Sequence, residues 1–180
     1  MPSIIDFKKK FYGGTRQNRF VVEGVIPGNG SISRFHVQQT QIPDISTLGI
    51  EYNYFGRKAF YPGEKSYNIW SMVFVDDTNE IGNHWKKFTR WQNNINNHTT
   101  NRSFVIGNNS DYKAYNWRVK QLNLDGDESS PLKTFIMHGC WPKTVGNLNF
   151  SVQNRDKLVE LKVDFVFDRI EIVGVTAPVS

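Results

Sequence analysis

The sequence predicts a mainly β fold, a β-barrel or sandwich of about seven to eight antiparallel strands with one flanking α-helix and extended arms. Two observations predict it. Apolar and polar residues alternate along several short segments, as in half-buried strands, and only one segment has the spacing of an amphipathic helix. Because no repeat or linker divides the chain, we expect one domain over residues 18–172, between an N-terminal arm, 1–17, and a C-terminal tail, 173–180.

The composition favours a folded protein with one core. The 180 residues suffice for a single domain, and aromatic residues, which bury large areas each, make up 14%. The sequence contains no run of about 18 apolar residues, so no membrane span is predicted. The first residues lack the apolar stretch of a secretory signal. Because Cys140 is the single cysteine, we expect no internal disulfide and synthesis in a reducing cytoplasm.

The positive charge is concentrated at the N-terminus. The net charge is +5. Residues 1–19 carry five cations and one carboxylate, so +4 belongs to this segment and about +1 to the rest. A nearly neutral body is not typical of a dedicated DNA-binding domain. The basic segment is interpreted as a solvated arm, and docking on an acidic neighbour or on nucleic acid stays open. Its lysines are Lys8, Lys9 and Lys10.

The N-terminal part of the domain predicts a β-hairpin over 19–40. Phe20, Val22 and Ile26 alternate on one face of the first strand. Asn29-Gly30 supplies turn chemistry, and a second strand is expected over about 31–40.

Segment 42–63 is aromatic yet interrupted by proline and glycine, which predicts an interaction arm. An irregular strand packed on the domain's own core remains the alternative. Candidate interface residues are Tyr52, Tyr54, Phe55, Arg57, Lys58, Phe60 and Tyr61, together with Lys8, Lys9 and Lys10.

The centre of the chain predicts a buried strand followed by the helix. Residues 67–75 are apolar on both faces in their second half, so burial on both sides is expected. Asp76 and Asp77 supply acids for the start of a helix over about 78–96. The spacing of three and four predicts one apolar face, made of Ile81, Trp85, Phe88, Gln92 and Ile95.

The C-terminal half predicts a polar loop over 93–110 and further strands. Strands are expected at about 112–124 and 131–140, the second ended by Trp141-Pro142, and 148–152 alternates. The last strand is the clearest. One face carries Leu161, Val163, Phe165 and Phe167, and the other carries Glu160, Lys162, Asp164 and Asp168.

The sequence contains no pattern that indicates catalysis, a metal or a cofactor, so we expect a protein that is not an enzyme. His36, His84, His98 and His138 are scattered without metal-ligand spacing. His84 is expected on the helix surface or in the core, and Cys140 as a small buried hydrophobe. The acids near 76 and 125 are interpreted as a helix cap and a turn rather than an acid–base pair or calcium loop.

Several strings, taken in order, resemble the tail tube proteins of contractile-tailed bacteriophages. They span about residues 16–168, and their order and spacing are more specific than any one of them. They are Arg16-Gln17-Asn18-Arg19-Phe20, Gln41-Ile42-Pro43, Tyr54-Phe55-Gly56-Arg57-Lys58, Tyr61-Pro62-Gly63, Tyr67-Asn68-Ile69-Trp70, Val75-Asp76-Asp77 and Gly139-Cys140-Trp141-Pro142 continuing to Leu148.

The resemblance implies a structural virion protein of the phage tail. Six subunits would form a ring, and rings would stack into a hollow tube inside a contractile sheath. The tube would meet baseplate, hub and terminator proteins, and the genome would pass through the lumen without specific binding. A baseplate tube initiator or related tail protein is the alternative within this class, and a nucleic-acid-binding β-barrel the alternative outside it.

The charge departs from the pattern of the family, whose lumens tend to be acidic. The chain is net basic, so an acidic or neutral lumen requires the basic arm to face elsewhere. The lumen-facing candidates are Glu160, Lys162, Asp164 and Asp168, a row that Lys162 keeps from being purely acidic.

Overall fold

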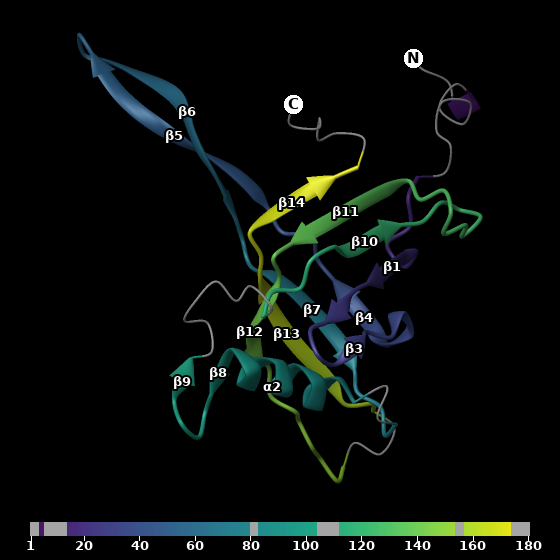
Figure 1. The fold of residues 1–180 in the computed structure, drawn as a ribbon. Helices are drawn as coiled ribbons and strands as arrows, with labels where there is room; N and C mark the ends of the chain where they lie inside the picture. Colours follow the sequence, from purple (N-terminus) through teal and green to yellow (C-terminus); the bar gives the residue numbers. More distant parts are fainter. Residues whose placement is uncertain (1–3, 6–13, 80–82, 104–111, 154–156, 174–180) are drawn as a thin grey trace.

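A computed structural model describes residues 4–5, 14–79, 83–103, 112–153 and 157–173. Two four-stranded antiparallel sheets form the body, and one helix lies against it (Figure 1). Sheet A has the order β1-β10-β11-β14, and sheet C the order β12-β13-β7-β4. The predicted mainly β fold is therefore confirmed.

The strands of sheet A are β1 Phe20–Glu23, β10 Trp117–Gln121, β11 Lys133–His138 and β14 Arg169–Ile172. Those of sheet C are β4 Val37–Thr40, β7 Trp70–Val75, β12 Trp141–Val145 and β13 Glu160–Val166. Two-stranded ribbons are formed by β2 Val25–Ile26 with β3 Gly30–Ser31, β5 Ile45–Tyr54 with β6 Arg57–Tyr67, and β8 Asn96–Asn97 with β9 Arg102–Ser103. The short 3-10 helix η1 spans Arg34–His36 and the helix α2 spans His84–Ile95.

The core lies between the two sheets and helix α2. Phe165 of β13 contacts the rings of Trp70, Phe88, Trp91 and Trp117, with centroids 5.0–6.3 Å apart. These five rings come from both sheets and the helix, and all are fully buried. All three buried indoles also donate hydrogen bonds: Trp70 Nε1 to Thr40 Oγ1, Trp91 Nε1 to the Tyr112 carbonyl and Trp117 Nε1 to the Val25 carbonyl.

The predicted faces of the first and last strands are confirmed. Val22 and Ile26 are buried while Val25 is exposed. Leu161, Val163, Phe165 and Phe167 are all buried, as the alternation requires. In β7 burial alternates instead, since Trp70, Met72 and Phe74 are buried and the residues between them are only half-buried, so the expectation of burial on both sides is wrong.

The predicted 19–40 hairpin is wrong. Strand β1 pairs with β10 and strand β4 pairs with β7, so the two strands belong to different sheets. Only β2 and β3 pair, around the turn at Gly28 and Gly30. Gly24 separates β1 from β2. A Cβ there would lie 2.6 Å from the Trp117 ring, so the indole occupies the space that a side chain would need.

Strand boundaries in the C-terminal half differ from those expected. The chain turns at Gly139, whose φ of +69° favours glycine, and Trp141–Val145 then begins a new strand that includes Pro142. Strand β12 is the edge of sheet C, where a missing N–H donor is tolerated. Residues 148–152 form no strand. The last strand ends at Val166, and β14 follows in the other sheet.

The helix begins later than expected, at His84 rather than about residue 78. The Asn83 side chain accepts a hydrogen bond from the Lys86 backbone N–H, and Asp76 Oδ1 accepts one from His84 N at 2.8 Å. The buried face consists of His84, Phe88 and Trp91, while Trp85 is exposed, so the predicted face is rotated. Ile81 lies outside the described residues, and part of the polar stretch 93–110 forms the β8–β9 ribbon.

Candidate assembly surface

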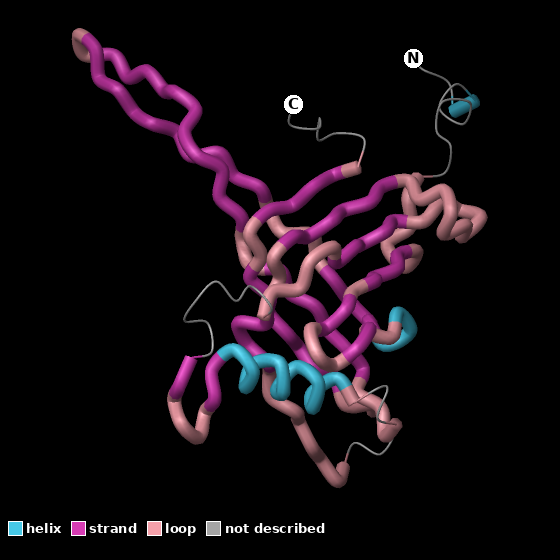
Figure 2. The backbone as a smooth tube through the Cα atoms, viewed as in Figure 1, coloured by secondary structure: helices cyan, strands magenta, loops and turns pink. Residues whose placement is uncertain are grey.

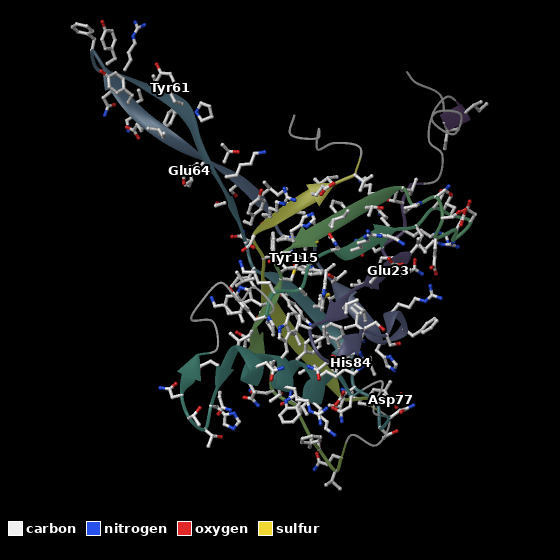
Figure 3. All side chains as sticks on the ribbon, in the orientation of Figure 1. Glu23, Tyr61, Glu64, Asp77, His84 and Tyr115 are labelled. Carbon is white, nitrogen blue, oxygen red and sulfur yellow. The ribbon has the colours of Figure 1, made fainter. Side chains whose placement is uncertain are left out.

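Segment 42–63, expected to be an arm, falls largely within a long two-stranded ribbon that projects from the body (Figure 2). Strands β5 and β6 have 10 and 11 residues, so the ribbon reaches about 34 Å at 3.4 Å per residue. Figure 3 shows Tyr61 and Glu64 standing clear of the sheets, and every residue of β5 is exposed. The alternative, a strand packed on its own core, is therefore wrong.

The ribbon has two different faces. Ile50 pairs with Tyr61, Tyr52 with Ala59 and Tyr54 with Arg57, and paired residues share a face, so this face is mostly apolar. The opposite face carries Glu51, Asn53, Lys58 and Phe60. There the Lys58 ammonium lies 2.7 Å from the Glu51 carboxylate.

Apolar side chains on this ribbon are exposed to an unusual degree. Ile50, Tyr52, Tyr54, Phe60 and Tyr61 have 55–68% of their area exposed, and Phe55 at the tip has 88%. An isolated two-stranded ribbon is only marginally stable in water, and contiguous apolar patches mark interaction sites. The ribbon therefore carries an exposed apolar surface of the kind that is typical of interaction sites.

Two glycines shape the ribbon. Gly56 has a φ of +75° and completes the two-residue turn with Phe55, whose φ of +46° is also positive. Positive φ at both central residues is typical of the tight turn that matches strand twist. Gly63 lies at the register shift between Thr47 and Gly49, and a Cβ there would meet the Leu48 carbonyl oxygen at 2.9 Å.

The structure places three of the four lumen candidates together. Glu160, Lys162 and Asp164 lie on the outward face of sheet C, and Asp164 accepts a hydrogen bond from Ser71 Oγ at 2.5 Å and faces Lys162 Nζ at 3.7 Å. Asp168 is not part of this row, because β13 ends at Val166. Its carboxylate instead accepts from Lys113 Nζ at 2.8 Å, and this hydrogen bond raises the pKa of Lys113.

The outward face of sheet A is more basic. Arg118, Lys120 and Arg169 lie there with Glu23 and Glu171, since all alternate with core residues. Lys120 Nζ lies 2.8 Å from Glu23, and His138 Nε2 lies 3.0 Å from Glu171. The two sheets therefore present outward faces of different charge balance.

Some members of the surface were missed by sequence reasoning, and others cannot be placed. Lys8, Lys9 and Lys10 lie outside the described residues. Leu48 and Ile50 were missed, although Ile50 alternates with Tyr52 and Tyr54 and so was detectable by its period. Phe150, Val152 and Leu158 were also missed; they are exposed in the loop between β12 and β13, where the alternation of Phe150 and Val152 had indicated a strand instead of an exposed loop.

The residues weighed for chemistry form no reactive site. His84 is fully buried against Phe74, with centroids 5.2 Å apart, and is therefore a core residue. Burial raises the pKa of the Cys140 thiol, which disfavours the nucleophilic thiolate. In the part of the chain that the structure describes, no three His, Cys, Asp or Glu residues gather to hold a metal ion. Nor is any described helix long and apolar enough to cross a membrane.

A family model described as phage tail tube protein matches residues 14–172. The chain belongs to this family. The membership implies a component of a virion tail and confirms that the chain is a structural protein rather than an enzyme. No curated protein sequence matches the chain.

This chain shares its fold with chains of contractile injection systems. A chain of the anti-feeding prophage tube-terminating cap is similar at 15% identity, with 90% of this chain and 92% of that chain covered and a TM-score of 0.63. A chain of the sheath/tube terminator of an extracellular contractile injection system has 17% identity, 88% and 96% coverage and a TM-score of 0.64. A chain of the sheath–tube complex of such a system has 16% identity, 94% and 97% coverage and a TM-score of 0.63. At these identities the likeness shows the fold.

Proposed function

We propose that this chain is the repeating subunit of a tail tube, built from stacked six-membered rings inside a contractile sheath. The genome passes through the lumen during ejection. Family membership supports a tube role, and the fold shared with a sheath–tube complex supports this setting. The tail sheath, the baseplate or hub and the terminator are its proposed partners, after synthesis in the host cytoplasm.

The observation that carries the proposal is the exposed β5–β6 ribbon. An isolated monomer gains nothing from this apolar face, because exposing apolar area to water costs free energy and promotes aggregation. A subunit that assembles with copies of itself covers such a face on every copy except at the ends. We therefore assign Tyr52, Tyr54, Phe55, Arg57, Lys58, Phe60 and Tyr61 to contacts between subunits, and the lysines at 8–10 to a neighbouring arm contact.

Sheet C is the proposed wall of the lumen. Its two edge strands, β12 and β4, lie on opposite sides, so a neighbour's sheet can join at each edge and rotation can close the ring. On its outward face Glu160 and Asp164 outnumber Lys162, whereas three cations oppose two carboxylates on sheet A. A wall that conducts DNA must not retain it, so the less basic face suits the lumen better.

A second candidate role has specific support. The similar folds include a tube-terminating cap and a sheath/tube terminator, and another is a chain of an anti-feeding prophage baseplate with a TM-score of 0.62 and 10% identity. A baseplate tube initiator or terminator would use the same fold once per tail. The nucleic-acid-binding barrel, by contrast, gains no support from the family match.

Negative-stain electron microscopy over a concentration series tests the proposal. We expect hollow rings with six-fold end views, extending into tubes at higher concentration or on purified baseplates. Rings that never stack, even on baseplates, would favour the terminator or initiator role. A protein that stays monomeric under all these conditions and binds DNA with strong salt dependence would refute both roles.

A further inference from the structure

Phe55, at the tip of the β5–β6 ribbon, occupies a backbone conformation that does not suit it. Its φ is +46°, in the left-handed region where asparagine, aspartate and glycine are usual and a bulky residue is an outlier. The first central residue of such a turn is most often asparagine or aspartate. A phenylalanine that is 88% exposed has only its ring contact with Tyr54 inside the monomer to offset this strain.

We propose that Phe55 is an aromatic anchor that inserts into an apolar groove on the opposite end of another copy of this chain. The inference rests on the proposed tube function and deepens it, because it names the two surfaces that join one ring to the next. Tyr54 supports the anchor: its ring meets the Phe55 ring edge-on with centroids 4.5 Å apart. The rigid tight turn holds both rings at the end of the ribbon.

The groove lies between the loop that joins β12 to β13 and the adjoining ends of β7 and β13. It measures about 890 Å³, enough for aromatic side chains. Phe150, Val152 and Leu158 line it and are 78%, 91% and 74% exposed. Three such side chains in one short loop form a second apolar surface that the monomer leaves uncovered.

The two surfaces lie at opposite ends of the molecule. In Figure 1 the ribbon extends upward from the body, whereas the yellow-green loop between β12 and β13 extends downward, beyond helix α2. The tip therefore cannot reach the groove of its own chain. Two different, complementary patches on one chain meet by joining one copy to the next, which is a heterologous contact.

Charge and area are consistent with this pairing. Arg57 follows the tip, and Glu160, at the start of β13, lines the groove and offers a carboxylate to the Arg57 guanidinium of another copy, although Lys157 lines the same groove. The five exposed aromatic residues of the ribbon have 55–88% of their area in solvent, so burying them would remove about 500–830 Å² from water at 150–250 Å² per fully buried ring. That matches the roughly 800 Å² per partner of a stable interface.

Trans cross-linking tests the pairing directly. Phe55→Cys and Val152→Cys proteins are mixed and treated with a short bismaleimide, in solution and after assembly, and the linked peptides are identified by mass spectrometry. Cys140 is fully buried, so the introduced thiols react first. We expect a 55–152 link between copies. The control pair replaces Phe55→Cys with Phe35→Cys, because Phe35 is similarly exposed at 83%, and it should give no link.

Substitution of the anchor separates its strain from its binding. Phe55→Asn suits the positive φ, so the folded monomer should be at least as stable as the wild type, while the concentration needed for assembly rises at least about tenfold. Phe35→Asn should leave that concentration unchanged. Hollow tubes without the 55–152 link, or unchanged assembly of Phe55→Asn, would overturn the anchor and leave the tube function standing. If no tubes form, the tube function is refuted. The presence or absence of the 55–152 link between copies in solution then tests the proposed contact on its own.

Discussion

The core and the β5–β6 ribbon use the same residue types in opposite environments. In the core, Trp70, Trp91, Trp117 and Phe165 are fully buried and touch one another across both sheets and helix α2. In the ribbon, tyrosines and phenylalanines stand in solvent. The difference teaches that aromatic content divides into two functions here. One set stabilises the monomer, and we propose that the other becomes stabilising only when a second protein covers it.

The largest effect is expected from Phe165→Ala, which breaks the core side of this comparison. Phe165 contacts four other buried rings, so the cavity should cost about 3–5 kcal/mol of unfolding free energy. Chemical denaturation of the monomer measures it, and assembly should be lost together with the fold. A cost below about 1 kcal/mol would mean that the core is not the source of stability.

The second largest effect, a loss of assembly, is expected from substitutions in the β5–β6 ribbon. Ile50→Thr combined with Tyr52→Thr keeps strand propensity but removes apolar area from one face. Unfolding free energy should change by less than about 0.5 kcal/mol, since these residues are exposed, while tubes disappear in electron micrographs. Asn53→Thr on the opposite face is the matched control and should leave tubes intact. A large loss of monomer stability in the double variant would remove the distinction between the two regions.

A smaller effect is expected where the core meets its helix. Asp76→Ala removes the carboxylate that accepts from His84 N, so one backbone donor at the start of α2 loses its partner. The cost should be about 1 kcal/mol, as for other helix caps, and is measurable as a lowered denaturation midpoint. Asp77→Ala, whose carboxylate bonds Thr78 instead, should cost less. Equal costs would show that the position of the acid relative to the helix does not matter.

The smallest effect concerns the Lys113–Asp168 ion pair near the end of β13. The hydrogen bond from Lys113 to Asp168 raises the pKa of the lysine above its ordinary 10.5. Its stabilisation is therefore fully present below that value and is lost as the pH rises through the higher folded-state pKa. Lys113→Met should cost less than about 1 kcal/mol near neutrality, and the difference from wild type should shrink above about pH 10. A difference that grows with pH would contradict this sign.

Sequence periodicity predicted the buried faces of the first and last strands, but it did not predict which strands pair. The buried row of β13 follows from alternation alone, because each side chain on a strand points opposite to the last. Pairing of β1 with β10 joins residues about a hundred positions apart, and no local pattern records which strands meet. For this reason the two strands within 19–40 were joined into one hairpin, although they lie in different sheets.

The errors in the helix and the ribbon have local causes. Phe88 and Ile95 are compatible with two buried helix faces, one that includes Trp85 and one that includes Trp91. The structure buries Trp91, whose indole N–H donates a hydrogen bond to the Tyr112 carbonyl. In the ribbon, Gly56 completes a turn, Gly63 lies at a register shift and Pro62 lies in a strand without a further neighbour, so residues interpreted as interruptions are compatible with pairing. Phe55 was among the predicted interface residues, but its backbone strain could not be predicted, because it is visible only in the φ angle.

The placement of the ribbon and the groove at opposite ends has a consequence for how a filament of this protein grows. Under the proposed contact, every filament has polarity, with free tips at one end and empty grooves at the other, because the ribbon and the loop between β12 and β13 extend in opposite directions. The two ends would then add subunits at different rates and require chemically different caps. Since a tip-in-groove contact has no closing geometry along the axis, this contact does not limit the number of copies. Filament length would then be set by something other than this contact, such as the supply of caps.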